Sequence, residues 1–212
     1  MKREDTKKRI LEKALELFSE RGYDAVSVGE IAAAVGIKAP SLYNHYESKR
    51  AIFDAILQDT AEQYKSYTNA IDVHVPDAEK DIGVFAGINE ERLLDKVRQI
   101  FTYSLHNEAV SRLRRMLTIE QLRSPELAGL YSQRYVDRLI AYHSELFDSL
   151  IAGGVLENAE PDELALMYTA PIITLLGICD RQPERETECQ KRLDAHVRLF
   201  FRTFNAGKGE KK

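Results

Sequence analysis

The sequence predicts an all-α protein. Apolar residues recur at helical spacing through nearly all of the 212 residues, and no alternating β-branched run of strand length interrupts them. Proline and glycine pairs separate the later helical segments. These breaks fall at Ser124-Pro125, Gly153-Gly154, Glu160-Pro161 and Gln182-Pro183.

The composition is that of an ordinary globular chain, with 44% hydrophobic and 30% charged residues. The net charge of −4 is unevenly placed. Residues 1–50 hold ten Lys and Arg against eight Asp and Glu, a net of +2, so the remainder carries −6. This asymmetry permits a local nucleic-acid surface at the N-terminus without proving one.

No secretory leader is expected, and the longest uncharged run, 164–179, has 16 residues. A membrane span needs about 20, so we interpret this run as a buried helix or an oligomer interface. Cys179 and Cys189 fit neither a disulfide framework nor a four-ligand zinc site. Two reduced thiols in a cytoplasmic protein are the simplest interpretation.

The first fifty residues read as three short helices. An apolar stripe over 6–21 ends at Gly22, and a capping box formed by Ser27 and Glu30 starts a helix that ends at Gly36. After a turn, Pro40 suits the first turn of a third helix, which we expect to continue through Tyr46. This pattern is typical of a helix-turn-helix, but pattern alone leaves a plain three-helix core equally open.

The rest of the chain is predicted to form a loop and six helices. Ser48 should cap a helix running past Tyr64, residues 72–88 are irregular, and Asn89 should cap the next helix. Further helices are expected at 109–123, 126–152, 161–180 and 186–205.

The segment from Thr6 to Leu57 resembles the signature of the tetracycline-repressor (TetR-type) transcriptional regulators. The residues that carry the resemblance are Phe18, Gly22-Tyr23, Ser27, Ile31-Ala32, Gly36-Ile37, Ser41-Leu42-Tyr43, His45-Tyr46 and Ser48-Lys49. The resemblance implies a helix-turn-helix DNA-binding domain at 1–50, a helical effector-binding and dimerisation domain at 51–207 and a tail at 208–212. It is carried by the first quarter of the chain, since the remainder matches only in length and helical character.

The expected DNA-binding residues surround the third helix. Asn44 is the best candidate base reader because an amide can bond adenine bidentately. Lys38 stands where the family often has Ser or Thr, so it could reach a phosphate or a guanine edge. Lys49 is unfavourable at a helix N-terminus and suggests a nearby phosphate. The complete set is Ser27, Lys38, Ala39, Pro40, Ser41, Tyr43, Asn44, His45 and Lys49.

In the larger domain the resemblance implies an effector pocket and a dimer interface made by the last two helices. Candidate pocket residues are Tyr103, His106, Met116, Glu120, Tyr142, His143 and Tyr168. Candidate interface residues are Leu164, Ile172, Leu176, Leu193, Val197, Phe200 and Phe204. The histidines show no metal-ligand spacing, and no catalytic constellation or phosphate-binding glycine loop is present, so we expect no metal, no cofactor and no enzyme.

The leading expectation is a homodimeric repressor in the cytoplasm that binds a pseudo-palindromic double-stranded operator and is released by a small molecule. An activator or a regulator without a ligand is the first alternative. A helical enzyme or binding protein with a vestigial DNA domain is a remote one.

Overall fold

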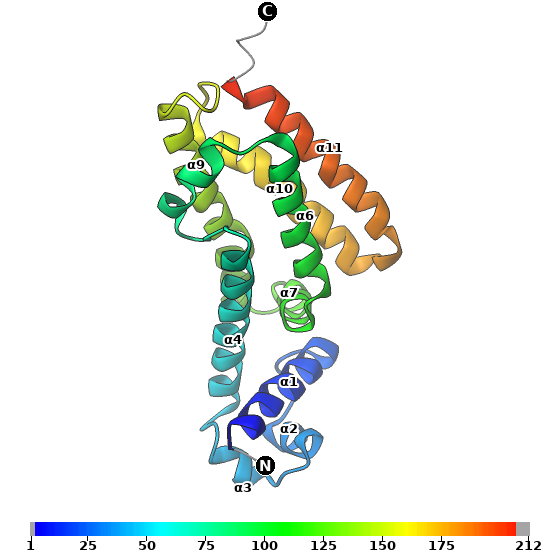
Figure 1. Ribbon diagram of the computed structural model, residues 1–212. Helices are drawn as coiled ribbons and strands as arrows, with labels where there is room; N and C mark the ends of the chain where they lie inside the picture. The colour runs from blue at the N-terminus through cyan, green and yellow to red at the C-terminus, as the bar shows by residue number, and fades with distance from the viewer. Residues whose placement is uncertain (1–2, 207–212) are drawn as a thin grey trace, which may run out of the picture. The chain divides into compact units, whose positions relative to one another are not determined.

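The computed structural model describes residues 3–206, which are almost entirely helical (Figure 1). The α-helices are α1 (Arg3–Arg21), α2 (Val28–Val35), α3 (Ala39–Tyr43), α4 (Lys49–Ala70), α5 (Ile82–Ala86), α6 (Glu90–His106), α7 (Glu108–Glu120), α8 (Pro125–Ser132), α9 (Arg138–Ala152), α10 (Pro161–Arg181) and α11 (Glu186–Phe204). Short turns of helix lie at η1 (Ala78–Lys80), η2 (Gln133–Asp137) and η3 (Pro183–Arg185). Within 3–206 the only β pairing is one isolated bridge, so the all-α prediction is confirmed.

The chain divides into two compact units. Unit 1 comprises Met1–Tyr64 and Asn107–Tyr131, and unit 2 comprises Lys65–His106 and Ser132–Lys212. This division differs from the expected boundary at residue 50, because α4 continues without a break and α7 packs on α1. The expected tail at 208–212 lies outside the described residues.

Unit 1 begins with three helices whose ends follow local rules. Ser27 caps α2 in a capping box with Glu30, and Gly36 ends it in the left-handed region at φ 77°. Pro40 stands in the first turn of α3, as expected. Ser48 caps α4, since its hydroxyl accepts a hydrogen bond from the Ala51 amide at 3.0 Å.

Helix α3 is shorter than the sequence suggested. It ends at Tyr43, with Asn44 as its C-cap, and the expected continuation through Tyr46 is wrong. The amides of His45 and Tyr46 both turn back to the Leu42 carbonyl. Leu42 is fully buried and anchors this turn. Helix α3 is therefore little more than one helical turn, held in place by a single apolar side chain.

The core of unit 1 joins α1, α2 and α4 to α7. Phe18 and Phe53 are each 1% exposed, and the Tyr23 ring packs against both, with centroids 5.1 and 5.0 Å away. Helix α7 adds the buried Leu113, Met116 and Leu117, while α8 is tied to α4 by an ion pair between Glu126 and Arg50. The helix-turn-helix therefore shares its core with a segment more than fifty residues away in sequence.

Unit 2 is built on α6, α9, α10 and α11, with α10 packed on each of the other three. Two apolar clusters fill it, one centred on the aromatic residues of α9 and α10 and one on Leu94, Cys179, Cys189 and Leu193. Both cysteines are free and buried. An ion-pair network joins α6 to α11, in which Glu90 meets Arg198 at 2.6 Å and Arg202 at 2.8 Å.

The segment 72–88 is more ordered than the expected loop, since it contains η1 and α5. Asp81, which is fully buried, organises it. Its carboxylate accepts a hydrogen bond from the His74 amide at 2.7 Å, lies 2.6 Å from His74 Nδ1 and accepts one from the Tyr142 hydroxyl of α9. A buried carboxylate requires such donors, and they hold the segment on α9.

His143 lies inside the aromatic cluster of unit 2. Its ring is 5.0 Å from Tyr142 and 4.9 Å from Tyr168, and its Nδ1 donates to the Leu139 carbonyl at 2.8 Å. Burial lowers the pKa of His143 to about 4, because the charged imidazolium would lose its hydration. The residue is therefore a neutral core group at pH 7.

We expect Gly22→Ala to destabilise unit 1 more than Gly36→Ala. Both glycines have positive φ, at 88° and 77°, so each alanine meets backbone strain of about 1–2 kcal/mol. Only at Gly22 would the new Cβ also collide with a side chain, the carboxylate of the buried Glu120. Urea unfolding should therefore show an additional loss in the free energy of unfolding of about 1–3 kcal/mol for Gly22→Ala. Adding Glu120→Asp should reduce this loss, because the shorter side chain withdraws the carboxylate from the new Cβ. Equal losses for the two alanine variants would contradict this packing.

We expect acid to weaken the fold through His143. Its folded pKa lies below the unfolded value, so the stabilisation is complete above about pH 6.5 and is lost as the pH falls towards 4. The stability lost over this pH range is on the order of 3 kcal/mol. Urea unfolding between pH 7 and 4 should show a shallower pH dependence for His143→Gln, whereas the exposed His106→Gln serves as the control. Identical slopes for wild type and His143→Gln would refute the assignment.

Candidate nucleic-acid interface and the cavities of unit 2

The side chains around α3 form a polar, outward-facing surface. Lys38, Ser41 and Asn44 are exposed, and Tyr43 is 52% exposed although it is aromatic. Among the described residues, Lys38 makes no ion pair, and it gives α3 no side-chain cap. Exposed polar groups beside a short, firmly anchored helix are what contact with base edges requires.

Ser27 is already engaged within the chain. Its hydroxyl lies 2.7 Å from a Glu30 carboxylate oxygen, and the Glu30 amide donates back to the hydroxyl at 3.2 Å. The amide and hydroxyl of Ser27, together with Arg21, lower the pKa of Glu30 to about 2. The capping role is confirmed, while contact between Ser27 and a phosphate stays a prediction.

Lys49 has a structural partner that the sequence did not indicate. Its ammonium donates to the Tyr23 carbonyl at 3.0 Å and to the Asp24 carbonyl at 3.4 Å, and it lies 4.4 Å from the centroid of the Tyr23 ring. The cation therefore links the start of α4 to the turn between α1 and α2. Its expected phosphate contact stays a prediction, and the positive charge at this helix start is accounted for within the chain.

His45 and the start of α3 complete the predicted set. His45 is partly exposed, yet its Nδ1 is buried and has no hydrogen-bond partner among the described residues. Pro40 is exposed and Ala39 is half-buried. All nine predicted DNA-binding residues belong to unit 1, and each is at least partly accessible: eight lie between Lys38 and Lys49, and Ser27 lies at the α2 cap.

The predicted effector residues are divided between the two units, and the pocket they were expected to form stays a prediction. Met116 and Glu120 are buried in unit 1, whereas the other five belong to unit 2. Tyr142, His143 and Tyr168 share the buried aromatic cluster, but Tyr103 stacks on Tyr67 at 3.8 Å. His106 pairs with Glu186 at 2.9 Å. Helical periodicity in the sequence does not distinguish side chains that line a cavity from side chains that pack in a core.

The predicted dimer residues are mostly core. Leu164, Leu193, Val197 and Phe200 are at most 6% exposed in the single chain, so they offer little surface to a second copy, and their place in an interface stays a prediction. Ile172, Leu176 and Phe204 are half-buried. The exposed apolar side chains of the same helices are Leu166, Met167 and Leu199, at 46%, 47% and 66%. Helical periodicity gave these helices an apolar face, but it did not show that most of this face packs inside unit 2.

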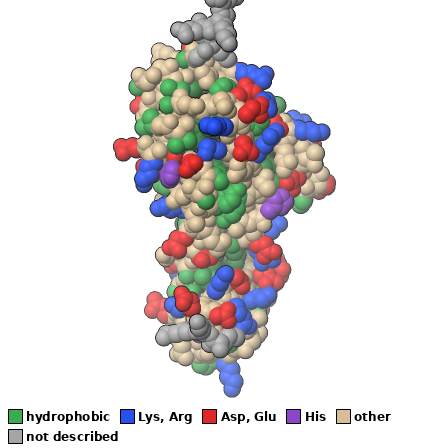
Figure 2. All heavy atoms as spheres, in the orientation of Figure 1, with side chains coloured by type: hydrophobic (Ala, Val, Ile, Leu, Met, Phe, Trp, Pro, Cys, Tyr) green, Lys and Arg blue, Asp and Glu red, His purple; other side chains and the backbone are tan. Residues whose placement is uncertain are grey.

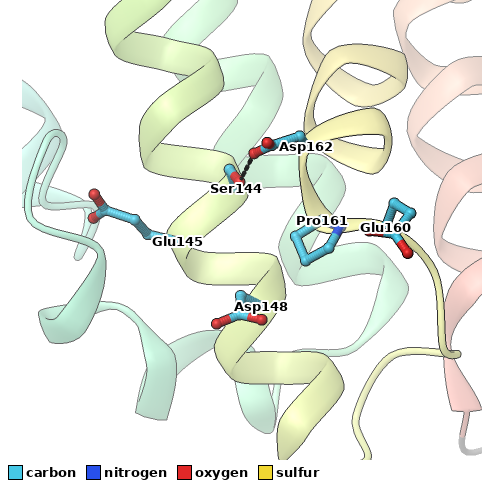
Figure 3. A pocket seen from close by; sticks show the side chains of 6 residues that line it. All are labelled: Ser144, Glu145, Asp148, Glu160, Pro161 and Asp162. Carbon is cyan, nitrogen blue, oxygen red and sulfur yellow. Dashed lines mark hydrogen bonds between the residues drawn. The ribbon is translucent and has the colours of Figure 1, made fainter.

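Two surface hollows lie in unit 2. The first, of about 250 Å³, is lined by Ser144, Glu145, Asp148, Glu160, Pro161 and Asp162. Figure 3 shows Ser144 on α9 hydrogen-bonded to Asp162 on α10, while Glu145 points away from them. No cationic side chain lines this hollow.

The second hollow, called here the α5–α6 cavity, has about 380 Å³. It is lined by Ile71, Asp72, Val84, Gly87, Ile88, Arg92, Asp95, Lys96 and Gln99. This cavity was not predicted from the sequence, because residues 72–88 were expected to be irregular. The i, i+3, i+4, i+7 spacing of its polar residues on α6 was the available signal.

The charges on the visible face of the molecule are mixed. In Figure 2, Lys and Arg side chains are interspersed with Asp and Glu side chains rather than gathered into one large patch. The ion pairs agree with this view, since Arg50, Arg98, Arg198 and Arg202 all lie against carboxylates. On this face, positive charge is therefore not gathered into one extended patch.

Comparison with known proteins supports this interpretation of unit 1. Residues 10–56 match the sequence profile of the family described as bacterial regulatory proteins, tetR family. The biofilm operon icaADBC HTH-type negative transcriptional regulator IcaR of Staphylococcus aureus (strain Newman) is 46% identical over 48 residues, 23% of this chain and 26% of the relative. The Staphylococcus epidermidis IcaR is 45% identical over 47 residues, 22% of this chain and 25% of the relative. The matched segment thus spans about a quarter of these relatives.

Solved structures match over almost the whole chain at lower identity. A TetR family transcriptional regulator from Pseudomonas syringae has a TM-score of 0.66 and 17% identity, covering 95% of this chain and 97% of its own. SmeT, the repressor of the Stenotrophomonas maltophilia multidrug efflux pump SmeDEF, has a TM-score of 0.65 and 18% identity, covering 94% and 90%. These structures show the shared fold of the helical part. The match identifies residues 10–56 as a DNA-binding domain of the kind found in the tetR family of bacterial regulatory proteins.

Proposed function

We propose that this protein is a sequence-specific, DNA-binding repressor of transcription that acts as a homodimer in the cytoplasm and leaves its operator when a small molecule binds. The observation that carries the proposal is the exposed polar surface around α3, presented by a helix-turn-helix of the tetR type. IcaR, whose DNA-binding segment is 46% identical, is named as a negative transcriptional regulator. Such a protein works by binding rather than by catalysis.

In this proposal α3 lies in the major groove. Asn44 reads a base edge, and Lys38 meets either a guanine edge or a phosphate. Tyr43 and His45 contact the phosphate backbone, whose negative charge makes binding sensitive to salt. Lys49 acts first as the brace that orients α3, because its ammonium is held by the Tyr23 and Asp24 carbonyls.

A dimer follows from the small size of α3 and from the outer faces of α10 and α11. A five-residue helix reaches few bases, so specificity requires two half-sites about 34–36 Å apart. Leu166, Met167 and Leu199 are large apolar side chains left exposed on α10 and α11. By length and composition α10 could also cross a membrane, with 33% of its most apolar window buried. Covering its outer face with a second copy accounts for that apolar surface.

Release by a small molecule is supported by a structural relative. SmeT, which shares the fold, has been solved in a complex with triclosan. A ligand that binds one conformation of the dimer better than another shifts the population between them by its difference in affinity. The spacing between the two α3 helices is the quantity such a shift must change.

The deciding experiment measures binding of the purified protein to DNA fragments from beside its own gene, over a series of salt concentrations. We expect tight binding to one fragment that weakens steeply with salt. A reporter for the neighbouring promoter should rise when the gene is deleted, and a fall would favour an activator instead. If the protein showed no salt-sensitive binding to any of these fragments, the proposed function would be contradicted.

Asn44→Ala should weaken binding to the operator by about 1–3 kcal/mol, since it removes a bidentate contact with a base. Binding to unrelated DNA should change little, because phosphate contacts remain. Asn158→Ala, an exposed asparagine in unit 2, is the matched control. Fluorescence anisotropy with operator and scrambled duplexes measures both. A uniform loss on the two duplexes would contradict base reading by Asn44.

Leu199→Glu should convert the dimer to a monomer, because a carboxylate would be buried without a partner at the proposed interface. The control is Leu122→Glu, which places the same charge at a 90% exposed leucine of unit 1. Sedimentation equilibrium at micromolar concentration distinguishes the two states. A wild-type monomer, or a dimer that tolerates both substitutions equally, would count against this interface.

A further inference from the structure

The α5–α6 cavity combines an apolar wall with a charged one. Val84 of α5, together with Ile71 just after α4 and Ile88 just after α5, supplies aliphatic surface. Helix α6 supplies Arg92, Asp95, Lys96 and Gln99, which share one face of the helix. The volume of about 380 Å³ is within the range of small-molecule sites.

Two of the four charged groups in the cavity are engaged by the chain itself. The Lys96 ammonium donates to the backbone carbonyls of Ile71 and Asp72, at the C-terminal end of α4. The Asp95 carboxylate accepts a hydrogen bond from the Gln99 amide at 2.7 Å. These contacts shape the wall and partly satisfy both charges.

The other two charges, on Arg92 and Asp72, have no ion-pair partner in the described part of the chain. Within residues 3–206 no carboxylate lies within 4.0 Å of the Arg92 guanidinium, and no cation lies that close to the Asp72 carboxylate. The two groups also fail to pair with each other, although both line the same cavity. Neighbouring acids on α6 are committed elsewhere, since Glu90 and Glu91 pair with Arg198.

We propose that the α5–α6 cavity binds a small zwitterion with an apolar body, the chemistry of an α-amino acid with a large apolar side chain. The ligand's carboxylate meets Arg92, whose planar fork suits bidentate pairing. Its ammonium meets Asp72, and its side chain lies against the aliphatic wall. A ligand with only one of the charges leaves the opposite protein group unpaired.

Gly87 leaves room for this ligand. A Cβ added there would meet no atom within 4 Å, and the backbone φ of −106° accepts any residue. A larger side chain at Gly87 can therefore occupy the cavity without backbone strain. Gly83, which lies in α5, is equally open but does not line the cavity, so it provides a matched control.

The test is calorimetric titration of the full-length protein, without DNA, with three probes that share a phenyl group. These are L-phenylalanine, 3-phenylpropanoate and 2-phenylethylamine. L-Phenylalanine should bind at least about tenfold more tightly than the other two, the scale of one charge-assisted contact. Because no DNA is present, this result stands or falls separately from the proposed repressor function.

Variants assign each contact. In Arg92→Gln, L-phenylalanine should bind no more tightly than 2-phenylethylamine, which lacks the carboxylate. In Asp72→Asn, L-phenylalanine should bind no more tightly than 3-phenylpropanoate, which lacks the ammonium. Asn tolerates the positive φ of 52° at position 72 as Asp does. Gly87→Leu should abolish binding, and Gly83→Leu should leave it unchanged. No binding by L-phenylalanine, equal binding of the three probes or unchanged binding to Gly87→Leu would overturn the proposal, with thermal unfolding confirming that each variant is folded.

Discussion

The contact between Lys49 and Tyr23 governs how this molecule presents its DNA-binding surface. The ammonium holds the Tyr23 carbonyl and faces its ring, and the ring in turn packs on Phe18 and Phe53. One side chain thus joins the turn after α1 to the first residue of α4. Helix α3 and its following turn lie between these two points in the chain, so their freedom to move is limited from both ends.

That constraint helps to explain how a helix as short as α3 keeps a defined position. Helix α3 has five residues, and isolated helices of this length do not persist in water. Its stability comes from Leu42, which is fully buried, and from the turn amides that bond the Leu42 carbonyl. Its stability therefore does not depend on the exposed side chains of Lys38 and Ser41, which stay accessible on its outer side.

The same helix-turn-helix is continuous with a larger core. Helix α7 packs on α1, and Glu120 reaches the backbone at Gly22, where only a glycine fits. A second link joins α8 to α4 through Glu126 and Arg50. Unit 1 is therefore assembled from two stretches of the chain, and a change in α7 or α8 bears directly on the packing of the DNA-binding helices.

The sequence alone determined the features that depend on neighbouring residues. The capping box at Ser27, the left-handed Gly36, the place of Pro40 and the family resemblance are local patterns, and the structure and comparisons confirm them. Tertiary structure decided what depends on distant residues: the partner of Lys49, the burial of Leu193 and Val197, and the α5–α6 cavity. Periodicity shows that a helix has an apolar face, but which neighbour covers it is set by packing across the fold.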